Sequence, residues 1–265
     1  MKKYFSYVLI IAMISSCATS PKGRKQLMLL PESNMVQMGF QSFQDIKKQT
    51  PAETNSKINA YVNCVLQPVL KAAGHVEGVD KWDIVVFHKD EANAFALPGG
   101  HIGVYTGILK VANTPGELAA VVGHEVGHVI AKHGNERVSE TMGANILLTA
   151  TGILAQKKGK NYGLLVAALG GPAVQFGLLL PHSRDQESEA DLIGLDLMSQ
   201  AGYDPHEAVQ LWKNMEASGG KQPPEFMSTH PSHGTRMNNL SAHIPETMAY
   251  YNKRKAEGNL PNCTQ

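Results

Sequence analysis

The sequence predicts an α+β fold that is mainly helical and contains one small β-sheet. Apolar residues recur at helical spacing in long segments, and short segments rich in β-branched and aromatic residues lie between them. Helix-capping sequences precede three of the helical segments. The chain has 265 residues, 43% of them hydrophobic, which is enough for one sizeable core. Its formal charge of +1 leaves no basic field for wrapping nucleic acid, so a nucleic-acid-binding role is not expected.

The first residues have the pattern of a secretory signal. Lys2 and Lys3 form a basic start, residues 4–14 are apolar but too short to span a bilayer comfortably, and small residues precede Cys17. A cysteine in this position resembles the bacterial lipobox, so we expect residues 1–16 to be a lipoprotein signal peptide and Cys17 to carry acyl chains. The alternative is an ordinary signal peptide that happens to contain a cysteine.

Residues 17–31 contain two prolines and a glycine, which predicts a lipidated tether ahead of a single domain over residues 32–265. Ala18 follows Cys17 at the position where lipoproteins retained at the inner membrane usually carry Asp. In a bacterium with two membranes, this resemblance implies lipid anchoring to the outer membrane, on its periplasmic side.

Cys64 and Cys263 remain as an even pair after removal of the signal, in a compartment that permits disulfides. A bond between them would pin the carboxyl-terminal tail to an early helix. The alternative is one buried thiol and one thiol in a frayed tail, because sequence does not supply the geometry.

The first half of the domain is predicted to hold two helices and then strands. One helix starts near Ser33, and a second runs from about Pro51 to Ala73, with Pro68 expected to kink or interrupt it. Residues 82–87 and 102–105 are predicted strands, and residues 93–100 a further strand that ends in a tight turn.

Three later helices follow from capping sequences. They open at Thr114, at Ser183 and at Asp204, and the first is expected to run through His133 and the second to end at Gly202. Residues 143–180 are the most apolar internal region. Gly170, Gly171 and Pro172 interrupt it, so a buried or interface-seeking helical hairpin is favoured over a true membrane span.

The chemistry is carried first by His124-Glu125-Val126-Gly127-His128, inside the helix opened by Thr114. Residues four apart share a helix face, so both imidazoles can reach one metal ion, with Glu125 beside them to take a proton from water. The alternative is a pair of surface histidines. The surrounding alanines and valines make a buried helix more consistent with the sequence.

A catalytic zinc site needs three protein ligands and an open position, so a carboxylate should lie further along the chain. Glu187 is the proposed third ligand, on the helix capped by Ser183. Asp191, four residues later on the same face, can accept the spare ring proton of a ligand histidine. The alternative is an acidic first helical turn stabilised by the helix dipole.

These motifs together resemble the gluzincin zinc metallopeptidases, the family that includes the CAAX prenyl protease, HtpX, BepA and LoiP. The resemblance extends to a cleft-edge strand and a late motif, and covers roughly residues 82–240. The quoted residues are His124-Glu125-x-x-His128, Ser183-Arg184-x-x-Glu187-x-x-Ala190-Asp191, Asn93-Ala94-Phe95-Ala96-x-Pro98-Gly99-Gly100, and Thr229-His230-Pro231 with Arg236. The chain lacks the tetratricopeptide repeats of BepA and the definite transmembrane helices of HtpX, which moves the resemblance toward LoiP-like outer-membrane lipoprotein metalloproteases.

The resemblance implies a gluzincin domain whose small sheet has an edge strand along the cleft, and one Zn²⁺ per chain. His124, His128 and Glu187 would be the metal ligands, Glu125 the general base and then proton donor, and Asp191 the support of a histidine ligand. Asn93, Ala94, Phe95 and Ala96 would form the edge that binds substrate.

Two further residues are carried over with alternatives left open. His230 matches a residue that can occupy the open metal position and restrain activity, although on sequence alone it is also consistent with a solvated imidazole in a turn. Arg236 would stabilise the developing oxyanion, or else form a surface salt bridge. The other histidines, including His133, have no partner spacing and are expected to be surface or second-sphere residues.

The predicted function is a zinc-dependent endopeptidase of periplasmic quality control that cleaves misfolded or unassembled envelope proteins. The alternative is a lipid-anchored chaperone or assembly factor with a latent zinc site. Glu125 favours catalysis, because a binding module needs no general base between two ligands. A zinc-storage lipoprotein would instead show exposed histidine clusters. The client, the cleavage preference and the oligomeric state do not follow from the sequence.

Overall fold

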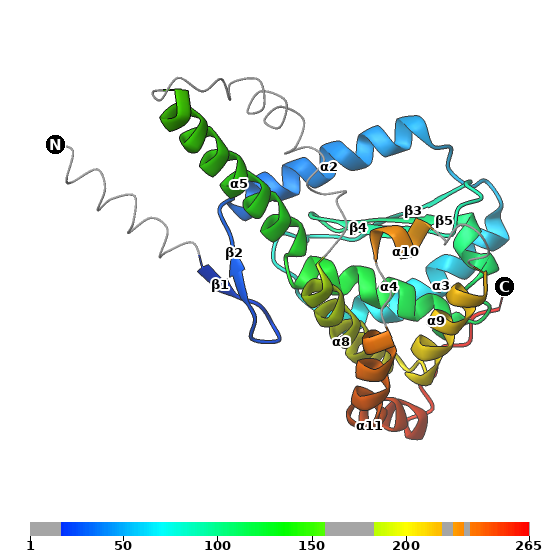
Figure 1. Ribbon diagram of the computed structural model, residues 1–265. Coiled ribbons are helices and arrows are strands. Elements are labelled where there is room, and N and C mark those ends of the chain that lie inside the picture. The colour runs from blue at the N-terminus through cyan, green and yellow to red at the C-terminus, as the bar shows by residue number, and fades with distance from the viewer. Residues whose placement is uncertain (1–16, 157–182, 219–224, 231–233, 265) are drawn as a thin grey trace.

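The computed structural model describes residues 17–156, 183–218, 225–230 and 234–264. Helices predominate in this part of the chain and surround a three-stranded sheet, which confirms the predicted α+β class (Figure 1). Helix α2 lies over one face of the sheet, and helices α3 and α4 lie on the other side. Their bounds are α2 Glu32–Gln49, α3 Ser56–Ala73 and α4 Pro115–Ile130.

Helix α3 departs from the prediction at two places. It begins at Ser56 rather than near Pro51, because the Asn55 side chain caps it while Ala52 forms a bridge with the sheet at Phe87. It also continues through Pro68, so the expected interruption is wrong. The proline removes one N–H donor from the helix, but the buried residues of this face hold the segment against the core.

The sheet has the order β3-β5-β4, so β4 is an edge strand. Strand β5 pairs in parallel with β3 and antiparallel with β4, and their bounds are β3 Asp83–Phe87, β4 Ala94–Leu97 and β5 His101–Tyr105. Phe95 lies directly opposite Gly103, where a Cβ atom would be 2.2 Å from the Phe95 ring. Only glycine fits there, so Gly103 allows the aromatic ring to lie across the sheet.

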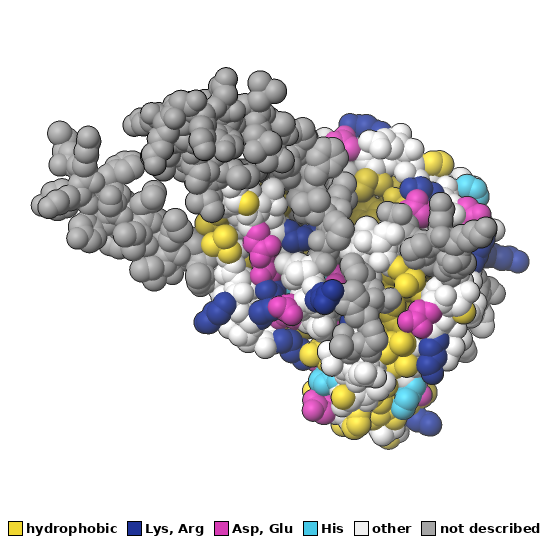
Figure 2. Space-filling model, viewed as in Figure 1, with side chains coloured by type: hydrophobic (Ala, Val, Ile, Leu, Met, Phe, Trp, Pro, Cys, Tyr) yellow, Lys and Arg dark blue, Asp and Glu magenta, His cyan; other side chains and the backbone are white. Residues whose placement is uncertain are grey.

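Residues 17–27, within the segment predicted as a tether, form an antiparallel hairpin of β1 (Cys17–Thr19) and β2 (Lys25–Leu27). The hairpin packs beside α8 (Arg184–Ala201), and Lys22 forms a salt bridge with Asp196 of that helix at 2.8 Å. Figure 2 shows basic and acidic side chains interspersed over this part of the surface.

Helix α4 ends earlier than predicted. It stops at Ile130, and α5 (His133–Gln156) begins after Lys132, whose backbone has a positive φ of 54°. A left-handed residue cannot continue a right-handed helix, so the chain turns sharply between the two helices. The predicted helix through His133 is therefore two helices with a break between them.

The remaining described helices complete the core. Helix α8 has the predicted capping box of Ser183 and Gln186 and ends at left-handed Gly202. Helix α9 (His206–Ser218) follows as predicted, whereas two helices near the carboxyl terminus are new findings, α10 (Glu225–Thr229) and α11 (Gly234–Ala256). Residues from α3, α4, α8, α9 and the sheet form one contiguous apolar core.

Helices α4 and α8 approach each other along a line of small residues. A Cβ atom on Gly123 would lie 2.8 Å from the carbonyl oxygen of Gly194, and one on Gly127 would lie 2.8 Å from that of Ala190. Both distances are shorter than real side-chain contacts, so larger residues would force the helices apart. This close packing brings the acidic residues of α8 to the histidines of α4.

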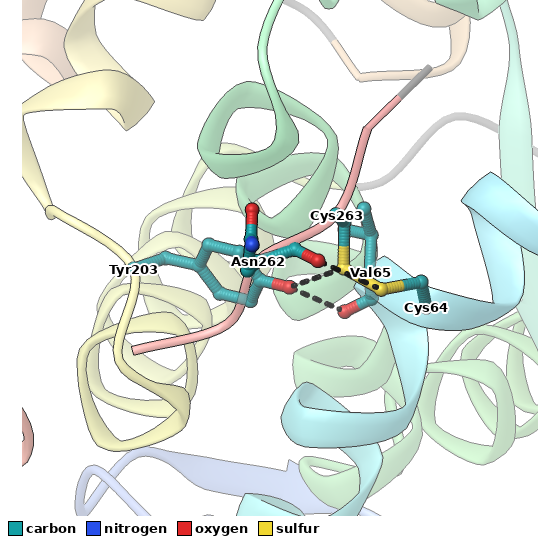
Figure 3. The surroundings of a disulfide bond; sticks show 5 residues. All are labelled: Cys64, Val65, Tyr203, Asn262 and Cys263. Atoms are coloured by element: carbon teal, nitrogen blue, oxygen red, sulfur yellow. Dashed lines mark hydrogen bonds between the residues drawn. A yellow bond between two sulfur atoms is a disulfide. The ribbon is translucent and has the colours of Figure 1, made fainter. Parts of the chain in front are cut away.

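Cys64 of α3 and Cys263 of the carboxyl-terminal tail are joined by a disulfide, with the S–S distance at 2.00 Å (Figure 3). Tyr203 points toward the bond and donates a hydrogen bond to the Val65 carbonyl oxygen at 3.2 Å. The bridge closes a chain segment of 199 residues and fixes the tail against the helix.

The apolar region predicted as a hairpin, residues 143–180, lies mostly outside the described residues. Its first part, up to Gln156, continues α5. Among the described residues, no helix has the length and apolar character needed to cross a bilayer.

Candidate metal centre

Two histidines of α4 form the base of the site. His124 and His128 are each 4% exposed, and their Nε2 atoms are 3.0 Å apart. Their four-residue spacing places both rings on the helix face that meets α8. The alternative of surface histidines is wrong, because apolar residues of α4 and α8 enclose them.

Glu187 of α8 supplies a third donor. One carboxylate oxygen lies 3.4 Å from His128 Nε2 and the other 3.4 Å from His124 Nε2, and the side chain is fully buried. In a tetrahedral zinc site with bonds of about 2.0–2.1 Å, neighbouring donor atoms are roughly 3.3 Å apart. The three donors therefore have both the chemistry and the mutual spacing that one zinc ion requires.

Asp191 fixes the ring of His124. Its Oδ1 atom is 2.9 Å from His124 Nδ1, so the imidazole donates its Nδ1 proton to the carboxylate and turns Nε2 toward the donors of the site. Arg236 holds Asp191 in turn, with Nε and an NH2 nitrogen each at 2.7 Å from the carboxylate. Its other terminal nitrogen is 2.8 Å from Glu187, and its guanidinium group stacks over Trp212.

His230, directly after α10, lies at the open side of the three donors. Its Nδ1 atom is 3.0 Å from Glu187 Oε1 and 3.1 Å from His124 Nε2, and the residue is 4% exposed. The alternative of a solvated imidazole is wrong, because the ring is buried and stacks on Phe226. Within the described part of the chain, His124, His128, Glu187 and His230 form a group that could hold a metal ion.

Glu125 connects the donor group to a cleft. Its Oε2 atom accepts a hydrogen bond from the N–H of Ala96 in β4 at 3.3 Å, and its Oε1 atom is 3.3 Å from His230 Nε2. A cleft of about 220 Å³ lies here, between the edge strand, α2 and α5. Its lining includes all four predicted edge residues, Asn93 to Ala96, together with Glu125, His128 and Arg137.

The charges of the site follow from burial and pairing. Burial raises the pKa of Glu125, while for Asp191 the neighbouring Arg236 outweighs burial and lowers the pKa. Burial opposes protonation of His124, yet Asp191 and Glu187 raise its pKa to about 9. The pKa of His128 lies well below the usual range because the ring is buried. Without metal, the site therefore holds a proton on His124.

The structure brings most of the predicted site residues together, but Arg236 does not lie where an oxyanion-stabilising residue was expected. Arg236 contacts Asp191 and Glu187 and does not line the cleft, whereas Arg137 of α5 does. The sequence did not predict Arg137. It left His133 as a surface or second-sphere residue without a partner, and the structure supplies that partner, because His133 Nδ1 is 2.8 Å from His128 Nδ1. The left-handed residue at the helix break is a lysine, a residue type that rarely adopts this conformation. A continuous helix would point neither side chain at the site.

Residues 56–244, most of the chain, match peptidase family M48. The chain belongs to this family. Family M48 consists of metallopeptidases, and the donor group formed by His124, His128 and Glu187 with His230 is suited to one zinc ion. Zinc is accordingly the cofactor of the site.

Three similar proteins illustrate this family. The mitochondrial metalloendopeptidase OMA1 of Schizosaccharomyces pombe is 37% identical over 188 residues, covering 70% of this chain and 53% of that protein. Human mitochondrial metalloendopeptidase OMA1 is 28% identical over 257 residues, covering 92% of this chain and 49% of that protein. The beta-barrel assembly-enhancing protease of Escherichia coli K12 is 24% identical over 215 residues, covering 76% of this chain and 42% of that protein. This M48 chain spans about half the length of these relatives.

Proposed function

We propose that this chain is a zinc-dependent endopeptidase that cleaves unfolded or unassembled proteins of the cell envelope. The observation that carries the proposal is the position of Glu125. It lies next to three zinc donors and receives a hydrogen bond from the edge strand, so base, metal site and substrate edge meet in one cleft. Membership of family M48 supports the same chemistry.

The proposed roles follow from these positions. A zinc ion held by His124, His128 and Glu187 would supply the Lewis acidity that polarises a peptide carbonyl and acidifies water. Glu125 takes the proton of the attacking water and passes it to the leaving amine. Burial suits this role, because a carboxylate with a raised pKa is a better proton carrier near neutral pH.

The arginines have different proposed roles. Arg236 orients Asp191 and Glu187, since its guanidinium group is in contact with both carboxylates. Lys132 and Arg137 both line the cleft, and Arg137 interacts electrostatically with Glu125 and Glu187. We assign contact with a substrate carbonyl to Arg137. This assignment replaces the oxyanion role expected for Arg236.

The edge strand suggests how substrate binds. Strand β4 pairs with β5 on one side only, so an extended peptide can add to its other side within the cleft. Such pairing reads main-chain groups and demands little of the side chains. Unfolded segments present those groups, whereas folded proteins have already paired theirs.

We further propose the location expected of a LoiP-like lipoprotein. Residues 1–16 would be removed as a signal peptide, and Cys17 would carry the lipid that anchors the chain to the periplasmic face of an outer membrane. The hairpin that begins at Cys17 packs on α8 through Lys22 and Asp196, so the anchor would hold the cleft near the membrane. Changing Cys17 to Ser should release the protein from the membrane fraction.

His230 supports a restrained state of the same enzyme. Its ring lies between the zinc donors and Glu125, where water and substrate have to enter. We propose that it occupies the fourth metal position and must move away for cleavage. This position also favours the second candidate function, a lipid-anchored chaperone or assembly factor whose zinc site is latent.

Cleavage of an unfolded protein tests the proposal and separates the two functions. The purified zinc-loaded chain, with and without a chelator, is incubated with reduced, carboxymethylated substrate and with the same protein in its folded form. Zinc-dependent cleavage of the unfolded form alone supports the peptidase. If wild type does not cleave, the same assay is repeated with His230→Ala. Cleavage by this variant indicates a restrained enzyme, whereas a variant that still does not cleave but suppresses aggregation indicates a chaperone.

A further inference from the structure

Beyond the donors and Asp191, a second supporting chain of contacts reaches the metal centre from the opposite side. His128 Nδ1 is 2.8 Å from His133 Nδ1, and His133 Nε2 is 3.2 Å from Glu189 Oε2. Glu189 in turn accepts hydrogen bonds from the Arg24 guanidinium group and the Lys22 N–H, both at 3.1 Å. These last two residues belong to the amino-terminal hairpin.

The contact between the two histidines exists because α4 breaks. In a continuous helix, residue 133 would be rotated by roughly 140° from residue 128 and would face elsewhere. The left-handed conformation of Lys132, at φ 54°, folds the chain back so that the His133 ring meets the His128 ring. A non-glycine residue in this conformation is uncommon and indicates that the surroundings impose it.

The donor and acceptor properties of the side chains fix the proton positions in the series His128, His133 and Glu189. Glu189 accepts only, so His133 donates its Nε2 proton to it and keeps Nδ1 as an acceptor. His128 then donates its Nδ1 proton to His133, which leaves the lone pair of His128 Nε2 directed at Glu187 and His124. His133 therefore fixes the tautomer and the ring orientation of His128, as Asp191 does for His124.

The hairpin makes the arrangement rigid. Arg24 contacts both Glu189 and Glu136, with two nitrogens on the Glu136 carboxylate. Gln186 and Gln26 donate further hydrogen bonds to Glu136 at 2.8 and 3.1 Å. His133 is fully buried, and Glu136 and Glu189 are nearly so. Every one of these polar groups is therefore held by another, and rotation of one requires several to move.

We propose that His133 is a positioning residue for the metal ligand His128, and that Glu189 and Arg24 hold it in place, so that the hairpin after Cys17 belongs to the support of the zinc site. The inference rests on the proposed zinc site but not on the proposed proteolysis. Partners of metal-ligating histidines typically contribute 10- to 100-fold to metal affinity, and about tenfold is expected here.

The test measures metal binding by the purified mature chain with two near-isosteric variants. In His133→Asn, the amide oxygen replaces Nδ1 and still accepts from His128; in His133→Gln, the amide reaches Glu189 but leaves His128 without that acceptor. Zn²⁺ affinity is measured by competition with a chromophoric chelator. The ligand geometry is read from the visible absorption bands of bound Co²⁺, which a loss of stability alone would not move.

We expect His133→Gln to lose about tenfold in Zn²⁺ affinity and to shift the Co²⁺ bands, and His133→Asn to stay within about threefold of wild type. Equal affinities and unchanged bands in both variants would overturn the proposal. The hairpin is tested by a matched pair, because Arg24→Gln and Lys22→Gln each remove one positive charge from it. Only Arg24→Gln should weaken Zn²⁺ binding, and equal effects would contradict the role of Arg24.

Failure of this proposal is distinguishable from failure of the proposed function. If wild type binds one Zn²⁺ and the two His133 variants bind it equally well, the positioning role is wrong, but the peptidase proposal is not affected. If wild type binds Zn²⁺ and the His133 variants differ as expected, while neither wild type nor His230→Ala cleaves protein, the positioning role stands and the peptidase proposal fails.

Discussion

Gly127 of α4 lies against Ala190 of α8 so closely that a Cβ atom on the glycine would be 2.8 Å from the alanine carbonyl oxygen. The glycine is one of the two free positions in the His124-Glu125-x-x-His128 motif, and Ala190 directly precedes Asp191. The spacing of the two helices, and with it the distance from His124 to Asp191 and Glu187, is therefore set partly inside the motif itself.

We expect Gly127→Ala to lower the free energy of unfolding by about 1–3 kcal/mol, because backbone atoms must move apart to admit the methyl group. Zn²⁺ affinity should fall as Glu187 withdraws. Gly143→Ala is the matched control, since its nearest neighbour would be a leucine methyl at 3.7 Å, and alanine favours a helix by up to about 1 kcal/mol. Urea unfolding of the metal-free proteins measures the stability of both variants against wild type. Equal stability of Gly127→Ala and wild type would show that the helices have room there.

Arg236→Gln should destabilise the metal-free protein by about 3–5 kcal/mol, because it leaves Asp191 and Glu187 buried without their cation. Arg236→Lys keeps the charge but loses the two-nitrogen contact, so an intermediate loss is expected. Chemical unfolding under chelating conditions provides the comparison. A loss below about 1 kcal/mol in the glutamine variant would mean that the arginine does not hold the carboxylates.

Zinc affinity should depend on pH through His124. Its pKa is about 9 without metal, so below that pH the ion must displace a proton from the ring. The apparent affinity therefore rises with pH, by about tenfold per unit up to pH 9, and one proton is released to the buffer. Calorimetry in buffers of different ionisation enthalpy counts that proton. Asp191→Asn removes a cause of the raised pKa, and its proton release at pH 8 should be smaller.

Removal of the disulfide should lower the free energy of unfolding without changing the affinity of the metal site for Zn²⁺. The bridge closes a segment of 199 residues, for which the unfolded-chain entropy predicts a stabilisation of up to about 5 kcal/mol. The Cys64→Ser, Cys263→Ser double variant is compared with wild type, each with and without reductant. Reductant should lower the stability of wild type alone, and Zn²⁺ affinity should stay within about twofold. If reductant does not change the stability of wild type, the disulfide does not stabilise the fold.

Local signals predicted the scaffold of the site well. The caps at Thr114 and Ser183 and the four-residue spacings of His124 with His128 and of Glu187 with Asp191 depend on neighbours in sequence, so helical periodicity was enough to orient them.

What the sequence did not predict depends on tertiary contacts. The left-handed residue at the break is Lys132 and not a glycine, and the nearest glycine, Gly134, lies two residues later inside α5. The salt bridges of Lys132 to Glu32 and Glu77 join distant segments. Residue spacing alone therefore gives His133 no partner, whereas in the structure its Nδ1 atom is hydrogen-bonded to His128 Nδ1. The resemblance predicts Arg236 at the cleft, but its guanidinium group instead pairs with the buried carboxylates Asp191 and Glu187 of α8.

The role of Glu125 as general base is tested by comparing zinc-loaded wild type with Glu125→Gln, with zinc content and cleavage rate measured on the same samples. Glutamine keeps the shape of the side chain and can still accept the Ala96 hydrogen bond, but it cannot carry a proton. We expect one Zn²⁺ per chain in both proteins, and a loss of cleavage of about 10²- to 10⁴-fold in the variant. Equal cleavage by the two zinc-loaded proteins would contradict the assignment of Glu125 as the base.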